Sequence, residues 1–284
     1  MQEARPSRTA YRVAVRRAEH QILDSHRVFD DPLSLRIIDA EMADRIRSGK
    51  VTRQQRLSPS FRAFMAVRSR YAEDELTRSV NQGVRQYVLL GAGLDTFAYR
   101  NPFAPDGLRV FEVDYPATQA WKRDCLAKGG IEIPPSVVFA PVDFEHQTVD
   151  EALSAVDFRR DEPAFFSWLG VVPYLTDGAF EGTIQFIAGL PATSGVAMDY
   201  AIPRSSLNLV ERIALDALSA RVARVGEPFR LFFDPGEMAA RLQGAGFRQI
   251  EDLGRDEINA RYFAGSHGRL KVRGNLAHLM CARV

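Results

Sequence analysis

Five short apolar runs constrain the fold of this chain more than any other feature. They lie at residues 87–90, 110–113, 137–140, 164–169 and 195–198, and each is followed within three residues by a glycine or an aspartate. Uninterrupted runs of this length are typical of strands buried on both faces, as in a parallel sheet. Helical patterns separate them, at residues 116–128, 177–188 and 205–222. This alternation predicts an α/β, doubly wound fold.

The C-terminal part continues this plan. Asp234-Pro-Gly-Glu237 has the features of a helix start: an aspartate as N-cap, proline at the first helical position, and glutamate three residues after the cap. Gly246 is expected to end that helix. Residues 248–253 and 276–283 are then expected to form two last strands, which brings the number of predicted strands to seven.

The first 80 residues lack such runs and show helical spacing instead. An apolar stripe recurs at Tyr11, Ala14, Ala18 and Ile22, and further helical segments are expected at residues 32–38 and 61–76. We therefore divide the chain into a helical cap over residues 1–80 and one α/β domain over residues 81–284. A helical insertion at about residues 201–233 is expected to lie on the substrate side of that domain.

Composition narrows the functional classes. Lys and Arg number 37 against 36 Asp and Glu, a net charge of +1, so no overall field favours nucleic acid or an anionic membrane. Residues 5–17 contain five arginines and no acid, which we interpret as a solvated helix face. The two cysteines, Cys125 and Cys281, are far apart, so neither a disulfide framework nor a metal site is expected. With no leader-like or membrane-length apolar run, we predict a cytoplasmic protein.

A glycine turn and an acid mark a candidate nucleoside site. The first predicted strand ends in Gly91-Ala92-Gly93, where glycines allow a ligand to approach the backbone closely. Asp114 lies 21 residues after Gly93, at the end of the second strand, where a carboxylate can accept hydrogen bonds from both ribose hydroxyls. The same features suit a nicotinamide dinucleotide, but Thr96 stands where that fingerprint has its third glycine.

Two further positions point to the same crevice. Asp143 and Phe144 follow the third strand, where the carboxylate could accept from the exocyclic amine of an adenine and the ring could pack against it. Arg68 falls within an apolar helical stripe, where a buried charge needs a carboxylate. That carboxylate could belong to the ligand or to a protein acid such as Asp74.

Five segments together resemble the leucine carboxyl methyltransferase-like family of class I S-adenosyl-L-methionine-dependent methyltransferases. They are His-Arg-Val-Phe-Asp-Asp-Pro-Leu at 26–33, residues 68–74, Gly-Ala-Gly-Leu-Asp-Thr at 91–96, Val-Phe-Glu-Val-Asp-Tyr-Pro at 110–116, and Phe-Ser-Trp-Leu-Gly-Val-Val-Pro-Tyr-Leu at 166–175. The resemblance covers nearly the whole chain. It implies a Rossmann-like fold with a seven-stranded, mostly parallel sheet, a reversed last strand and a helical cap over the cofactor.

The resemblance also implies roles for single residues. Arg68 would bind the carboxylate of S-adenosyl-L-methionine, the glycine turn its methionine moiety, Asp114 the ribose, and Asp143 with Phe144 the adenine end. The chain departs from the family at Phe97, where members often have arginine, and at Ser167, near which several have glutamate. The expected cofactor site consists of Arg68, Gly91, Ala92, Gly93, Asp114, Tyr115, Asp143, Phe144 and Ser167.

The resemblance favours O-methylation of a carboxylate or hydroxyl on a small organic molecule or natural product. Tyr174 and Tyr200 follow strand ends that face the crevice and are candidate substrate contacts, and the histidines are too scattered to indicate a catalytic base. Cofactor binding without catalysis and a nicotinamide-dependent oxidoreductase are the alternatives. An apolar set in the insertion could be core or pocket lining: Leu207, Val210, Ile213, Ala214 and Leu218.

Overall fold

A single seven-stranded sheet forms the centre of the computed structural model, which describes residues 7–50, 59–144, 146–265 and 270–284. The strands lie in the order β3-β2-β1-β4-β5-β7-β6, and β7 runs in the opposite direction to the other six. This confirms the predicted mostly parallel sheet with a reversed last strand. The strands are β1 (Gln86–Leu90), β2 (Arg109–Asp114), β3 (Val137–Pro141), β4 (Ala164–Trp168), β5 (Gly195–Ala201), β6 (Gln249–Leu253) and β7 (Ala277–Arg283).

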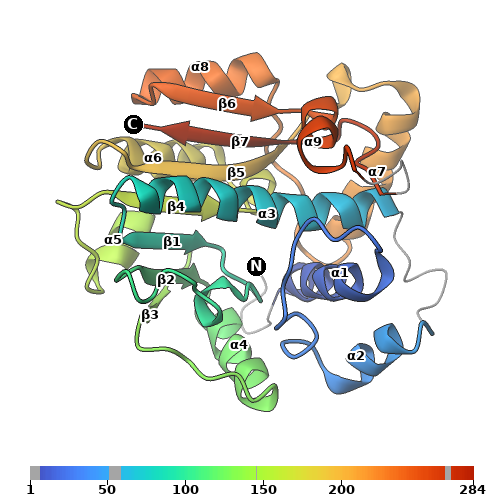
Figure 1. Ribbon diagram of the computed structural model, residues 1–284. Coiled ribbons are helices and arrows are strands. Elements are labelled where there is room, and N and C mark those ends of the chain that lie inside the picture. The colour runs from blue at the N-terminus through green and yellow to red at the C-terminus, as the bar shows by residue number, and fades with distance from the viewer. Residues whose placement is uncertain (1–6, 51–58, 145, 266–269) are drawn as a thin grey trace.

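Helices cover both faces of the sheet and its carboxyl edge. In Figure 1, α3 crosses one face, while α1 and α2 lie beyond the arrowheads of β1 and β2. None of the helices among the described residues is long and apolar enough to cross a bilayer. The helices are α1 (Arg8–Leu23), α2 (Ala40–Arg47), α3 (Pro59–Asn81), α4 (Pro116–Lys128), α5 (Val149–Ser154), α6 (Asp177–Ala188), α7 (Leu209–Ala223), α8 (Pro235–Ala245) and α9 (Arg255–Tyr262), with three-residue 3₁₀ helices η1 (Phe97–Tyr99), η2 (Val172–Tyr174) and η3 (Arg204–Ser206).

Alternation along the strands explains the uninterrupted apolar runs. In β1, Tyr87 and Leu89 belong to the apolar cluster that includes α3, whereas Val88 and Leu90 belong to the cluster that includes α5, α6 and α8. Successive side chains of a strand point to opposite faces, so a strand covered on both sides is apolar throughout. Because α3 packs directly into one of these clusters, the last helix of the expected cap is part of the core around the sheet.

The N-terminal segment departs from the expected helical pattern. Residues 32–38 form turns rather than a helix, because the Asp31 carboxylate accepts the Leu33 amide at 3.2 Å and its carbonyl accepts the Ser34 amide. In α1, Ala14 and Ala18 are buried as expected, but Ile22 is 44% exposed. Part of the arginine-rich stretch is also buried.

Arg16 and Arg17 are 8% and 3% exposed, so the interpretation of residues 5–17 as a solvated helix face is wrong for these two arginines, whereas Arg12 is exposed as expected. Each of these two arginines lies beside a carboxylate: Arg16 donates to Glu19, and Arg17 to Asp95. Pairing is what allows guanidinium groups to be taken out of water. Arg5 lies outside the described residues.

The apolar face expected in the insertion is largely solvent-exposed. Helix α7 matches the predicted element, but Val210 and Ile213 are 75% and 62% exposed and Ala214 is also exposed. The helix packs through Leu215 and Val222 instead. The exposed set is therefore neither core nor lining of the cavity described below.

A buried ion pair attaches α4 to β2. The Lys122 ammonium donates to Glu112 at 2.7 Å, and the Tyr99 hydroxyl donates to the other carboxylate oxygen at 3.0 Å. Both charged side chains are at most 1% exposed. Burial raises the pKa of Glu112, and the ammonium and the Tyr99 hydrogen bond oppose that rise. The pair holds the start of α4 beside the carboxyl end of β2, where Asp114 lies.

Replacing Lys122 with methionine is expected to destabilise the fold by about 3–5 kcal/mol, because it leaves the Glu112 carboxylate buried without its cation. The pKa of that carboxyl rises further in the folded variant, so the folded state binds more protons and stability falls as pH rises. Urea unfolding should therefore show a larger loss at about pH 8 than at about pH 5. The exposed Lys128→Met variant is the control; an equal loss at both pH values would contradict this account.

Candidate functional site

A cavity of about 420 Å³ opens at the carboxyl ends of the parallel strands. This is the edge where ligands bind in open α/β sheets, and the volume lies in the range of small-molecule pockets. Helix α1 and the segment after α7 contribute further walls. The lining includes ten of the eleven residues that the sequence pointed to: Arg68, Gly91, Ala92, Gly93, Asp114, Tyr115, Asp143, Phe144, Ser167 and Tyr174.

The glycine turn after β1 forms the floor of the cavity. Gly91 and Gly93 have φ angles of 68° and 48°, in the left-handed region that favours glycine. The amides of Gly91 and Ala92 both donate to the Val113 carbonyl, which holds the turn against β2. A Cβ at Gly91 would lie 2.4 Å from a methyl of Val171, so the turn also requires glycine for packing.

No α-helix follows this turn directly. A 3₁₀ helix of three residues, η1, follows instead. Thr96 and Asp95 are engaged elsewhere: the Thr96 hydroxyl donates to Asp31 at 2.8 Å, and Asp95 accepts the Phe97 amide at 2.8 Å. These bonds hold the chain in a non-helical path.

Asp114 lies between the turn and the start of α4. One carboxylate oxygen accepts the Gly93 amide at 2.5 Å and the other accepts the Tyr115 amide at 2.7 Å. Burial raises the pKa of Asp114, and these two hydrogen bonds oppose that rise. The amides fix the orientation of the carboxylate, and a carboxylate has about four lone-pair sites, so further donors can still bind.

Arg68 forms a buried ion pair inside the cavity wall. Its Nη1 donates to Asp199 at 3.1 Å, and the second oxygen of Asp199 accepts the Gly170 amide at 2.5 Å. Among the described residues, Arg68 Nε has no hydrogen-bond partner although it is buried. Asp74, the protein partner considered from the sequence, pairs with Arg70 instead.

Asp199 was missed by sequence reasoning, although it directly follows the fifth apolar run. The guanidinium of Arg68 lies so close to Gly170 that a Cβ there would be 2.9 Å from Nη1. Gly170 itself has a φ of 70°. The loop after β4 therefore holds the arginine side chain against β5.

The two candidate tyrosines have different locations. Tyr174, in η2, lines the cavity, and its ring centroid is 5.1 Å from that of Phe229. Tyr200 does not line the cavity: its side chain is fully buried and its hydroxyl donates to Asp252 at 2.9 Å. Adjacent residues of a strand point to opposite faces, so when Asp199 faces Arg68, Tyr200 must face away.

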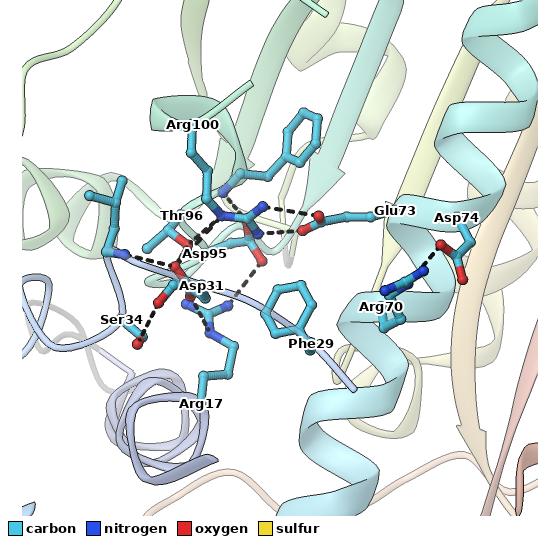
Figure 2. Close-up of polar contacts among 12 residues, drawn as sticks. Arg17, Phe29, Asp31, Ser34, Arg70, Glu73, Asp74, Asp95, Thr96 and Arg100 are labelled. Atoms are coloured by element: carbon cyan, nitrogen blue, oxygen red, sulfur yellow. Dashed lines mark hydrogen bonds and ion pairs between the residues drawn. The ribbon is translucent and has the colours of Figure 1, made fainter. Parts of the chain in front are cut away.

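Helix α1 and the segment that follows it are bonded to the glycine turn through a polar cluster (Figure 2). Arg17 of α1 donates to Asp95 at 3.0 Å and to the Leu94 carbonyl at 2.5 Å, and its Nε lies 3.5 Å from Asp31. Asp31 in turn accepts the Thr96 hydroxyl. Segments 26–33 and 91–96, which both carry the family resemblance, therefore contact each other, and Asp31 of the first segment binds Thr96 of the second.

On its other side the cluster reaches α3. Arg100 pairs with Glu73 of that helix, and its Nε lies 3.6 Å from Asp31. The guanidinium also lies over the rings of Phe29 and Phe97 at 5.2 and 5.7 Å. Phe97 occupies the position where the family often has arginine, and here Arg100 brings a guanidinium beside it.

Several lining residues were not found from the sequence. Arg17 was read as part of a charged stretch, although it lies beside Ala14 and Ala18 on the buried side of α1. The others come from the start of α1 and from the loop after α7, where no local pattern marks them: Ser7, Thr9, Gly226, Glu227 and Arg230.

Comparisons with known proteins agree with this geometry. The pattern of the family described as leucine carboxyl methyltransferase matches residues 10–188. YktD of Bacillus subtilis (strain 168), named as an S-adenosyl-L-methionine-dependent methyltransferase, is 30% identical over 302 aligned positions that cover 96% of each chain.

Solved structures share the fold. A crystal structure from Thermobifida fusca YX, described as that of a methyltransferase, has a TM-score of 0.60 and 16% identity, and covers 99% of this chain and 96% of its own. A DUF574 family protein from Streptomyces avermitilis MA-4680 has a TM-score of 0.58 and 15% identity, covering 94% and 99%. The family pattern spans more than half of the sequence, and so the chain belongs to the leucine carboxyl methyltransferase family, with S-adenosyl-L-methionine as its cofactor.

Proposed function

We propose that this chain transfers a methyl group from S-adenosyl-L-methionine to a carboxylate or hydroxyl oxygen of a small organic molecule. The observation that supports this most is the convergence of Arg68, Asp114 and Asp143 on one cavity, although they come from α3, the end of β2 and the loop after β3. When bound, the cofactor supplies a methyl group on a sulfonium. The protein has then to align the acceptor, and positioning of this kind contributes on the order of 7–11 kcal/mol.

In this proposal Arg68 binds the carboxylate of the cofactor. A guanidinium has five N–H donors, and Asp199 accepts from one nitrogen, Nη1. The buried Nε, without a partner among the described residues, is an orphaned donor that a ligand carboxylate would satisfy. Asp199 is then a positioning residue, because it fixes the guanidinium while the ligand occupies its other donors.

Each of the remaining residues would contact a different part of the cofactor. Asp114 would accept from the ribose hydroxyls, and Asp143 with Phe144 would border the adenine. Ser167 at the end of β4, with the turn from Gly91 to Gly93, would line the methionine part. A nicotinamide dinucleotide fits less well, because Thr96 fills the third-glycine position and is bonded to Asp31.

The same cavity supports a small acceptor. Its walls include the apolar side chains of Val13, Leu169, Val171 and Leu175, which suit an organic molecule better than a polyanion. We propose that residues 1–80 act as a cap over the cofactor and that residues 201–233 border the acceptor. The wall segment that follows α7 supports the second assignment.

Replacing Asp114 with alanine is expected to weaken S-adenosylhomocysteine binding about 100-fold, because hydrogen bonds to a charged group contribute about 1.5–3 kcal/mol each. Calorimetric titration of the wild type, of Asp114→Ala and of the exposed control Asp106→Ala would measure this. NADH is titrated in parallel and should not bind. Binding of NADH, or equal S-adenosylhomocysteine affinity in all three proteins, would contradict the proposed cofactor site.

Replacing Gly170 with alanine is expected to weaken S-adenosylhomocysteine at least about tenfold, because the new Cβ would displace the Arg68 guanidinium. Gly107→Ala is a matched control: Gly107 also has a positive φ, 85°, but open space around its Cβ position. Both variants bear a comparable backbone strain. Equal affinity in the two variants would show that the position of Arg68 does not matter for the cofactor.

A further inference from the structure

Glu227 is a carboxylate held at the cavity wall by contacts from distant parts of the chain. It follows α7, is partly buried, and accepts a hydrogen bond from the Thr9 hydroxyl of α1. Its loop is attached to η2, because the amides of Arg230 and Leu231 both donate to the Pro173 carbonyl at 2.6 and 3.2 Å. Glu227 is therefore a placed group of the cavity.

Two other acidic residues that line this cavity have their charge balanced or their orientation fixed by strong hydrogen-bond donors. Asp95 pairs with Arg17, and Asp114 accepts two backbone amides. For Glu227 the structure shows only the Thr9 hydroxyl, and no cation lies within 4 Å of it among residues 7–50, 59–144, 146–265 and 270–284. Its negative charge therefore acts on whatever occupies the space beside it.

Two other residues that line the cavity, Tyr174 and Asp114, lie close enough to Glu227 for its charge to affect them. Burial raises the pKa of Tyr174, and the Glu227 carboxylate raises it further. The same carboxylate contributes to the raised pKa of Asp114. Glu227, Tyr174 and Asp114 all line the same cavity, so the carboxylate lies near both the proposed ribose site and Tyr174. A nucleophile that enters the cavity beside the loop after α7 would meet this carboxylate.

We infer that the acceptor is a hydroxyl compound, a phenol or an alcohol, and that Glu227 is the catalytic residue that takes its proton. This rests on the proposed function. The acceptor oxygen forms a bond to the methyl carbon, the carbon–sulfur bond breaks with its electron pair left on sulfur, and the hydroxyl proton passes to the Glu227 carboxylate. A carboxylate acceptor needs no base and would be repelled by Glu227.

Arg230 offers the opposing possibility. It also lines the cavity, and among the described residues its side chain has no carboxylate partner, so it could attract an anionic acceptor. Arg230 is exposed, however, and an exposed charge is screened by water, whereas Glu227 is partly buried. The two residues therefore make opposite predictions about the acceptor, which one set of variants can separate.

The test uses the full chain and a labelled methyl donor. The acceptors are phenols of graded acidity, simple alcohols, and benzoic acids matched to the phenols in ring substitution. The proteins are the wild type, Glu227→Gln, Glu227→Asp, Arg230→Gln and Glu132→Gln, the last being a control at an exposed position outside the cavity.

The wild type and Glu132→Gln should methylate hydroxyl compounds and not the matched acids. In Glu227→Gln, kcat for weakly acidic phenols should fall about 100-fold or more, the contribution typical of a positioned base. Phenols acidic enough to be ionised in solution should lose much less, because they bring no proton to remove. Glu227→Asp should retain part of the activity, and Arg230→Gln should keep the preference for hydroxyl compounds.

A binding measurement gives a second readout that does not depend on turnover. In the S-adenosylhomocysteine complex, the wild type should bind phenol more tightly than benzoate by calorimetry. Glu227→Gln should bind benzoate at least about tenfold more tightly than the wild type does, because the like charge is gone. Its S-adenosylhomocysteine affinity should equal that of the wild type.

Each contrary result overturns the inference in a recognisable way. Methylation of the acids alone, or of no hydroxyl compound by a protein that binds S-adenosylhomocysteine, rejects the hydroxyl acceptor. A uniform loss across the phenol series in both Glu227 variants shows a structural role. Loss of S-adenosylhomocysteine affinity in Glu227→Gln makes the residue a cofactor ligand. Failure of the wild type to bind S-adenosylhomocysteine instead defeats the proposed function itself.

Discussion

The ion pair between Arg68 and Asp199 is the interaction on which the rest of the site depends. It joins α3 to β5 in the interior, and the Gly170 amide binds the same carboxylate, so the loop after β4 is attached to it as well. Breaking a buried pair leaves an uncompensated charge, which is strongly unfavourable. Three separate segments are thereby held at fixed positions around the cavity. The apolar packing of α3 alone would allow the helix to slide or rotate, whereas a directional contact of this kind sets its register.

Most of the fold could be predicted because its signals are local. An apolar run of five residues reports a strand covered on both faces, and the turn residue after it marks the carboxyl edge of the sheet. Gly91, Gly93 and Asp114 were found in this way, since the spacing between the first two strand ends reflects one crossover. The Asp234 N-cap and the glycine after α8 could be predicted in the same way. These features need no knowledge of what packs against them.

The errors arose where a distant partner decides the outcome. Tyr200 and Asp199 are neighbours, and choosing the one that faces Arg68 requires knowing which face α3 covers. Arg17 is buried only because Asp95 and Asp31 lie beside it, and the turns after Asp31 replace a helix because that carboxylate binds local amides. Val210, Ile213 and Ala214 of α7 resemble a core face, but all three are exposed. Glu227 has no local signal, because its loop gains its place only through Pro173 and Thr9.

The contact between Thr9 and Glu227 joins side chains 218 residues apart in the chain at the wall of the cavity. One belongs to the first turn of α1 and the other to the loop after α7. A change in the position of either segment would therefore reshape the wall that both of them form. Substitutions in one of these segments are accordingly expected to act on the cavity through the other, although the two are distant in sequence.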